Sequence, residues 1–145
     1  MLIAALACLA LIALTALVHY EVLGALNTRL PGLRIPRRSK LLVVFFTAVA
    51  AHAFEVLLYG LALFALVRWA GVGGLAGSAG FSLESSLYFS AETYTSLGFG
   101  DLTPVGPIRL LAGAEALNGL LLIGWTASYT YIAMERFWTQ TDLPM

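Results

Sequence analysis

Three long apolar stretches alternate with short polar segments along the chain. They cover about residues 2–26, 41–67 and 107–134, and about 20 apolar residues cross a bilayer as a helix. The first stretch starts at Met1 without a basic leader and is longer than the apolar core of about 7–15 residues in a signal peptide. We therefore expect it to be retained, and the pattern predicts an all-α membrane protein with three transmembrane helices.

The polar segments between these stretches predict how the chain is oriented. Residues 27–40 hold five basic side chains, no acidic one, and helix-breaking prolines and a glycine. By the positive-inside rule this loop is cytoplasmic, as is the short tail at residues 135–145, and the N-terminus lies outside. Residues 71–80 contain five glycines and predict an extracellular connector without stable helix.

A short amphipathic segment, residues 82–95, follows the glycine-rich connector. As a helix it would rise about 20 Å, too little to cross the membrane, so it must enter and turn back. Ser82 is placed to cap it, with Glu84 in its first turn, while Ser85 at the third position means that the glutamate-bearing capping box is absent. Irregular backbone at membrane depth needs cover from protein or a water-filled cavity, so neighbouring subunits around a pore are implied.

Composition supports this picture and excludes other classes. The 145 residues are 60% hydrophobic and 11% charged, against about 45–50% and about 25% in soluble domains. A net charge of zero gives no basic face for nucleic acid. Cys8 is the only cysteine, which excludes an intrachain disulfide and a multi-thiolate metal site. Zinc-protease, nucleophile-elbow and phosphate-loop motifs are missing, so we expect one membrane domain that is not an enzyme and needs no cofactor.

Residues 95–101, with the sequence Thr-Ser-Leu-Gly-Phe-Gly-Asp, carry most of the functional information. Backbone carbonyls can replace the hydration shell of a cation where the chain is narrow and extended, and two glycines one residue apart permit the necessary backbone angles. The preceding helix would also point its negative end toward the membrane centre, which favours cations. The segment predicts an ion pore.

Residues 82–135 resemble the pore module of the potassium-channel superfamily. The family pattern Thr-Val-Gly-Tyr-Gly-Asp is here Ser-Leu-Gly-Phe-Gly-Asp at residues 96–101. The layout is also similar to small bacterial two-transmembrane channels with an extra N-terminal helix. The resemblance implies an outer helix at 41–67, a pore helix at 82–95, a selectivity filter at 96–101, an inner helix at 107–134 and a peripheral first helix. It implies that potassium, the permeant ion, binds the carbonyls of Ser96, Leu97, Gly98 and Phe99, and that Gly100 completes the filter.

The same resemblance assigns supporting roles beside the filter. Glu92 and Asp101 are expected to lie together and share a proton, with Tyr88 donating to Asp101; alternatively Glu92 reaches water and Asp101 faces solvent. Phe89 stands where the family has a polar aromatic partner for the filter tyrosine, so both ends of that hydrogen bond are absent together. Thr95 directly precedes the filter.

Ionisable groups inside the helices form a second set of candidates, because charge within a bilayer is costly. His52 and Glu55 are one turn apart, as are Glu115 and Asn118, and similar depths place Glu55 against Asn118. This set is either a proton-sensitive link through His52 or a hydrogen-bond network that only fixes packing. Gly119 is either a hinge or a close-packing position.

A single filter strand cannot enclose an ion, so closure requires rotational symmetry, and the family precedent is a homotetramer in the lipid bilayer. The expected function is passive, potassium-selective conduction. A weakly selective channel for monovalent cations and a non-conducting scaffold or accessory subunit are the alternatives. Ala, Leu, Gly and Arg usage suggests a bacterial inner membrane.

Overall fold

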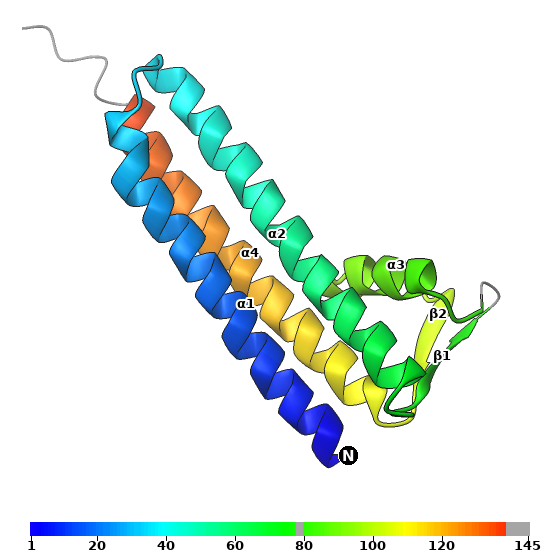
Figure 1. Cartoon of the computed structure of the whole chain (residues 1–145). Coiled ribbons are helices and arrows are strands. Elements are labelled where there is room, and N and C mark those ends of the chain that lie inside the picture. Colours follow the sequence, from blue (N-terminus) through cyan, green and yellow to red (C-terminus); the bar gives the residue numbers. More distant parts are fainter. Residues whose placement is uncertain (78–79, 139–145) are drawn as a thin grey trace, which may run out of the picture.

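The computed structural model describes residues 1–77 and 80–138, without the side chain of Trp138, and is mostly helical (Figure 1). The elements in chain order are α1 (Leu2–Arg29), the short 3₁₀ helix η1 (Leu30–Gly32), α2 (Arg37–Arg68), β1 (Gly74–Gly77), α3 (Leu83–Tyr94), β2 (Leu102–Val105) and α4 (Ile108–Trp138). Part of the predicted glycine-rich connector and residues 139–145 of the predicted tail lie outside the described residues. The predicted order of helices is confirmed.

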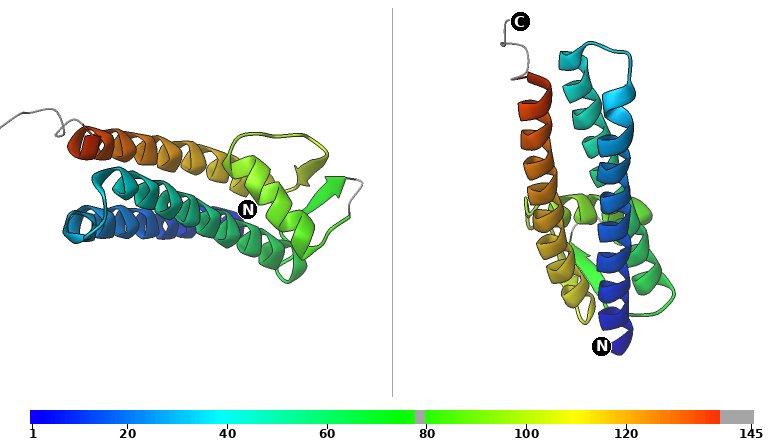
Figure 2. Two further views of the ribbon diagram at one scale, coloured as in Figure 1. Left: turned by 90° about the horizontal axis from the view of Figure 1, so that it is seen from above. Right: turned by 90° about the vertical axis from the view of Figure 1, so that its left-hand side faces the viewer.

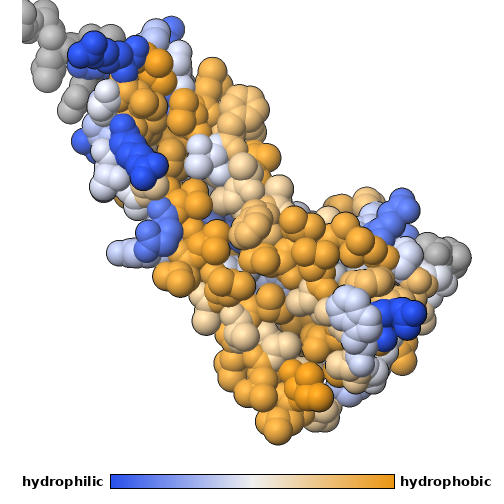
Figure 3. All heavy atoms as spheres, viewed as in Figure 1, coloured by the Kyte–Doolittle hydropathy of each residue, from blue (hydrophilic) through white to orange (hydrophobic). Residues whose placement is uncertain are grey.

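The three long helices run side by side, and α3 lies crosswise against the side of the bundle, in the half that also carries β1 and β2 (Figures 1 and 2). Each of α1, α2 and α4 is long and apolar enough to cross a membrane. α3 contacts both α2 and α4, while α1 packs against α2 and α4 on the other side. Apolar residues cover most of the visible shaft, as membrane-spanning helices require (Figure 3).

The glycine-rich connector contains a strand that the all-helical expectation missed. β1 pairs antiparallel with β2, with Gly74 opposite Val105 and Gly77 opposite Leu102. A Cβ atom at Gly73 would lie 2.2 Å from the carbonyl oxygen of Val105, so this glycine is needed for the close approach. This pair of strands thus ties the connection between α2 and α3 to the segment that follows the candidate filter.

The start of α3 is fixed by a pair of serines. The hydroxyl of Ser82 accepts a hydrogen bond from the amide of Ser85 at 3.0 Å, and the hydroxyl of Ser85 accepts one from the amide of Ser82 at 2.8 Å. This is a reciprocal capping box with serine in the position usually taken by glutamate or glutamine. Two amides at the helix start are satisfied, so α3 begins where the sequence predicts.

Glycines in both neighbouring helices let α3 approach closely. A Cβ atom at Gly60 in α2 would be 2.7 Å from Cδ2 of Leu87, and one at Gly119 in α4 would be 2.1 Å from the carbonyl oxygen of Tyr94. Real Cβ contacts are not that short, so a larger residue would force α3 and its neighbours apart. Of the two roles considered for Gly119, the structure supplies direct evidence for close packing.

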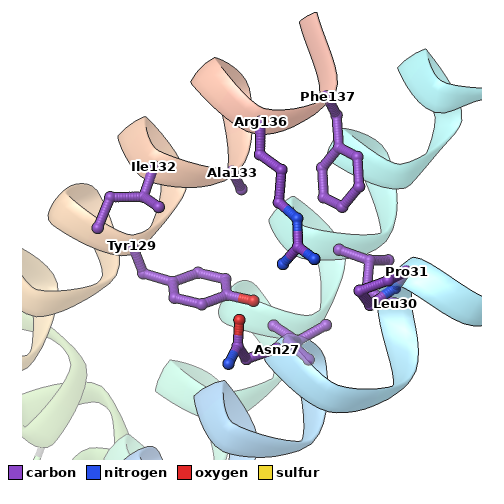
Figure 4. Close-up of a pocket in the computed structure, with 9 residues that line it drawn as sticks. Asn27, Leu30, Pro31, Tyr129, Ile132, Ala133, Arg136 and Phe137 are labelled. Atoms are coloured by element: carbon purple, nitrogen blue, oxygen red, sulfur yellow. The ribbon is translucent and has the colours of Figure 1, made fainter. Parts of the chain in front are cut away.

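The opposite end of the bundle is organised around a basic side chain. Nζ of Lys40 donates to the carbonyl of Pro31 at 2.8 Å and lies over the ring of Phe137, 5.3 Å from its centroid. The helix α2 begins at Arg37, four residues earlier than predicted. The charged residues directly after Pro36 form its first turn. A shallow pocket between α1 and α4 at this end is lined in part by Tyr129 and Arg136 (Figure 4).

Candidate ion-conducting site

The segment after α3 has a backbone unlike either a helix or a strand. Ser96, Gly98 and Gly100 have φ angles of +58°, +56° and +80°, and no positive φ occurs at Leu97 or Phe99 between them. Alternation between left- and right-handed backbone conformations lets successive carbonyls turn toward one side while the chain stays narrow. The two glycines adopt the left-handed region without strain, whereas Ser96 does so at a cost of about 1–3 kcal/mol.

The C-terminal end of α3 holds the first residues of this segment. The carbonyl of Glu92 accepts hydrogen bonds from the amides of Leu97, at 2.8 Å, and Gly98, at 3.3 Å, and the carbonyl of Thr93 accepts from Ser96 at 3.0 Å. These carbonyls would otherwise lack partners at the end of a helix. The candidate filter is therefore a direct continuation of the cap of α3.

The side chain of Glu92 adds a further contact to the same segment. Its Oε2 atom accepts a hydrogen bond from the amide of Phe99 at 3.1 Å, and the residue is only 4% exposed. Glu92 was expected to pair with Asp101, but the structure gives its carboxylate to the filter backbone instead. The side chain reaches neither bulk water, as in the alternative, nor a hydrogen bond with Asp101 among the residues described.

Asp101 has the other partner that was expected. The hydroxyl of Tyr88 donates to Oδ1 of Asp101 at 3.2 Å. Partial burial, together with the negative charge of Asp101, raises the pKa of the Tyr88 hydroxyl above its ordinary value of 10.0. Tyr88 therefore stays protonated, and able to donate, at neutral pH.

The remaining predicted supports lie on α3. Phe89 is buried in the core that all four α-helices and β2 share, whereas Phe99 is 67% exposed in the single chain. The hydroxyl of Thr95 donates to the carbonyl of Ala91 at 2.8 Å and so caps the helix end. Phe89 and Thr95 thus fix α3, and their effect on the filter passes through the position of that helix.

The intramembrane polar residues pair differently from the sequence expectation. His52 Nδ1 does lie 3.1 Å from Oε2 of Glu55, as predicted. Glu55 and Asn118 were expected at similar depths, where they could touch, and among the described residues the side chain of Asn118 donates instead to the hydroxyl of Thr15 in α1, at 2.8 Å. Nor is Glu115 paired with Asn118: its Oε1 atom accepts from the hydroxyl of Ser90 in α3. Depth alone could not show which side of each helix faces which neighbour.

Sequence reasoning missed His19 as a member of this network. His19 is fully buried, and its Nδ1 atom lies 2.8 Å from Oε1 of Glu55. The Tyr94 hydroxyl donates to the other carboxylate oxygen of Glu55. An ionisable residue in an apolar helix was the available signal for His19, whereas a tyrosine hydroxyl at the end of α3 carries no such signal.

The fold and this site define a multi-pass membrane protein in which a helix ending within the bundle presents a narrow, glycine-containing segment. A family model described as ion channel matches residues 40–136. The chain belongs to this ion-channel family and is not an enzyme. The matched range contains α3, the candidate filter and nearly all of α2 and α4, and it leaves out α1.

Three relatives show where the likeness is concentrated. The chain is 51% identical over 61 residues to Protein LctB of Geobacillus stearothermophilus, covering 42% of this chain and 46% of the relative. It is 52% identical over 40 residues to Protein LctB of Bacillus caldotenax, covering 28% and 30%. It is 34% identical over 76 residues to the inward rectifier potassium channel Kirbac3.1 of Paramagnetospirillum magnetotacticum, covering 52% and 26%.

The matched segments thus span less than half the length of each of these relatives. No solved structure matches this chain significantly. The comparisons therefore support the class of protein, an ion channel, more strongly than any particular ion or assembly.

Proposed function

We propose that the protein is a passive potassium-selective channel whose filter is formed by residues 96–100 of four identical subunits. The alternating backbone of Ser96, Gly98 and Gly100 carries this proposal, because a dehydrated cation needs rings of carbonyl oxygens along a narrow path. In this arrangement the carbonyls of Ser96, Leu97, Gly98 and Phe99 bind potassium, and Gly100 ends the filter.

The need for neighbouring subunits follows from what one chain leaves uncovered. The apolar side chains of Leu97 and Phe99, within the candidate filter, are 58% and 67% exposed in the single chain. In a rotationally symmetric assembly these side chains pack behind the filter strand, while the carbonyls face the shared axis. Four copies enclose a single ion path, and monovalent cations and lipid are the partners.

The potassium preference receives support from one relative. Kirbac3.1 carries the words inward rectifier potassium channel in its name, and it is 34% identical to this chain over 76 residues. Here Ser96 keeps a hydroxyl at the inner end of the filter and Phe99 follows the first filter glycine. A selective filter is further supported by Gly98 and Gly100. Both have left-handed backbone, and no atom lies within 4 Å of the place that a Cβ atom would take at either residue.

The orientation follows from the distribution of charge. The end of the bundle that holds Lys40 and the arginines of residues 29–38 is proposed to be cytoplasmic by the positive-inside rule. The N-terminus, the β1–β2 pair and the outer end of the filter then lie on the extracellular side. We place the protein in the inner membrane of a bacterium. The C-terminus is cytoplasmic.

Reconstitution into liposomes tests the proposal. We expect potassium flux that exceeds sodium flux and that barium blocks, with a reversal potential in mixed solutions set by potassium. The variant Gly98→Ala, which puts a side chain on left-handed backbone, should abolish flux, while Gly124→Ala in α4, with no atom within 4 Å of the added carbon, should conduct normally. Equal potassium and sodium permeability would indicate the weakly selective channel, and absence of flux from an intact tetramer would indicate the scaffold.

A further inference from the structure

Three ligand-bearing side chains meet in the interior of the bundle, and none of them belongs to the candidate filter. One ligand atom from each of His19, His52 and Glu55 lies within 4.8 Å of the other two. His19 comes from α1 and the other two from α2. His19 and Glu55 are fully buried, and His52 is one-fifth exposed. Two imidazoles and a carboxylate are a common donor set for transition metals.

One hydroxyl contacts the same ring nitrogen, Nε2, of both histidines. Oγ1 of Thr126 in α4 lies 3.0 Å from Nε2 of His19 and 2.9 Å from Nε2 of His52. Both Nδ1 atoms consequently face the carboxylate of Glu55, at 2.8 Å and 3.1 Å. The oxygen of the Tyr94 hydroxyl reaches the same place, since it contacts Glu55 and lies 2.9 Å from Nδ1 of His52.

The hydrogens of the two imidazoles and the threonine hydroxyl do not serve every contact in this cluster. Four contacts link His19, Thr126, His52 and Glu55 into a closed ring, and each contact needs one hydrogen. A threonine hydroxyl supplies one hydrogen, and two neutral imidazoles supply one each. With Glu55 ionised, three hydrogens serve four contacts. The fourth contact is served either by the Tyr94 hydroxyl, whose oxygen lies 2.9 Å from Nδ1 of His52, or by a cation bound between the imidazoles and the carboxylate.

A metal ion placed on the carboxylate side satisfies all these groups. With both Nδ1 atoms bound to metal, each Nε2 carries a hydrogen and donates to Thr126, whose oxygen has two lone pairs. The threonine hydrogen is then free to turn to a backbone carbonyl one turn earlier in α4. Metal-bound histidines almost always donate their other ring nitrogen to such a second partner.

We propose that His19, His52 and Glu55 bind one divalent transition-metal ion such as Zn²⁺, with the Tyr94 oxygen as the fourth ligand. Imidazole nitrogen favours these metals over Mg²⁺ and Ca²⁺, which prefer oxygen ligands. Binding forms two metal–nitrogen and two metal–oxygen bonds and displaces one hydrogen ion, that of the Tyr94 hydroxyl, to solvent, because each neutral imidazole keeps its single hydrogen on Nε2. The ionised carboxylate and phenolate then balance the charge of the metal, which a membrane interior requires.

Direct metal binding to the purified full-length protein tests this site, independently of whether the protein conducts. After equilibrium dialysis with Zn²⁺ in detergent, we expect one Zn²⁺ per chain. His19→Gln and His52→Gln should lose it, because the chain has only two histidines. Cys8→Ser and Glu21→Gln are matched controls, removing the only cysteine and an exposed carboxylate on α1, and should bind like the wild type.

Two measurements keep the proposal open to refutation if the glutamine variants do not fold. Thr126→Val leaves every ligand in place but removes the shared acceptor, so Zn²⁺ affinity should fall by about 10–100-fold with unchanged stoichiometry. Co²⁺ added to the unmodified protein should give the strong visible absorption of a four-coordinate site. No Zn²⁺ uptake by the wild type, full uptake by folded glutamine variants, unchanged affinity in Thr126→Val, or a purely octahedral Co²⁺ spectrum would overturn it.

Discussion

The carboxylate of Glu92 accepts a hydrogen bond from the main-chain amide of Phe99, across 3.1 Å. The carbonyl of the same residue accepts hydrogen bonds from the amides of Leu97 and Gly98. One residue of α3 therefore holds three consecutive amides of the candidate filter. The strand is thereby fixed from behind, on the side opposite to the proposed ion path.

Replacing Glu92 should change how the filter behaves. Glu92→Ala leaves the amide of Phe99 without its partner, which costs about 1–3 kcal/mol in a buried site, so open probability or inactivation should change in single-channel recordings. Glu92→Gln keeps an acceptor oxygen and should stay closer to the wild type. Glu84→Ala removes an exposed carboxylate from the same helix and serves as the control. Unchanged gating in Glu92→Ala would show that this contact does not control the filter.

The close packing of α4 on the end of α3 predicts a strong effect at one glycine. Gly119→Ala would place a carbon 2.1 Å from the Tyr94 carbonyl oxygen, and overpacking of this kind costs about 1–3 kcal/mol. The thermal unfolding midpoint of the purified protein should therefore fall.

Gly113→Ala is the matched control on the same helix, because no atom lies within 4 Å of the added carbon. It should be neutral or slightly stabilising, by up to about 1 kcal/mol, since alanine favours helix. If Gly119→Ala unfolded at the wild-type temperature and altered only opening, the hinge role would be favoured over packing.

The polar contact between α1 and α4 predicts how firmly the N-terminal helix is attached. Thr15→Val removes the acceptor for Asn118 with little change of shape, and one such hydrogen bond within a membrane is worth about 0.6 kcal/mol. A small loss of stability is expected in denaturation of the detergent-solubilised protein. Thr28→Val removes an exposed hydroxyl that bonds to carbonyls of its own helix and should have no comparable effect. Equal losses in both variants would argue against the interhelical contact.

The contact between Tyr88 and Asp101 predicts a shifted tyrosine titration. The pKa of Tyr88 is raised above 10.0 by partial burial and the Asp101 charge, so the neutral hydroxyl is favoured in the folded state. Its stabilising contribution is complete below the unfolded pKa and is lost as pH rises through the folded pKa. A near-ultraviolet absorbance titration of the wild type minus Tyr88→Phe should show ionisation above pH 10.0. In Asp101→Asn the transition should move back toward 10.0, and an unshifted wild-type transition would contradict the contact.

The helices and the candidate filter could be predicted because their signals are local. Apolar stretches of spanning length, the Ser82 cap and the two glycines at 98 and 100 each depend on neighbours in sequence. The antiparallel pairing of β1 with β2 was not predictable in this way. Its strands are four residues each and separated by the whole of α3, so their pairing depends on how that helix returns the chain.

The amino-acid sequence by itself determined three apolar helices, a short helix before the last of them and the glycine-containing motif of the candidate filter, because hydrophobic length and glycine positions act along the chain. Only the tertiary structure decided the partners: Glu92 with the Phe99 amide, Asn118 with Thr15, and His19 with Glu55. A polar group within an apolar helix must find a partner, but its sequence position gives only its depth. The rotation and neighbours of each helix, set by packing such as that of Gly119 on Tyr94, determine which partner it meets.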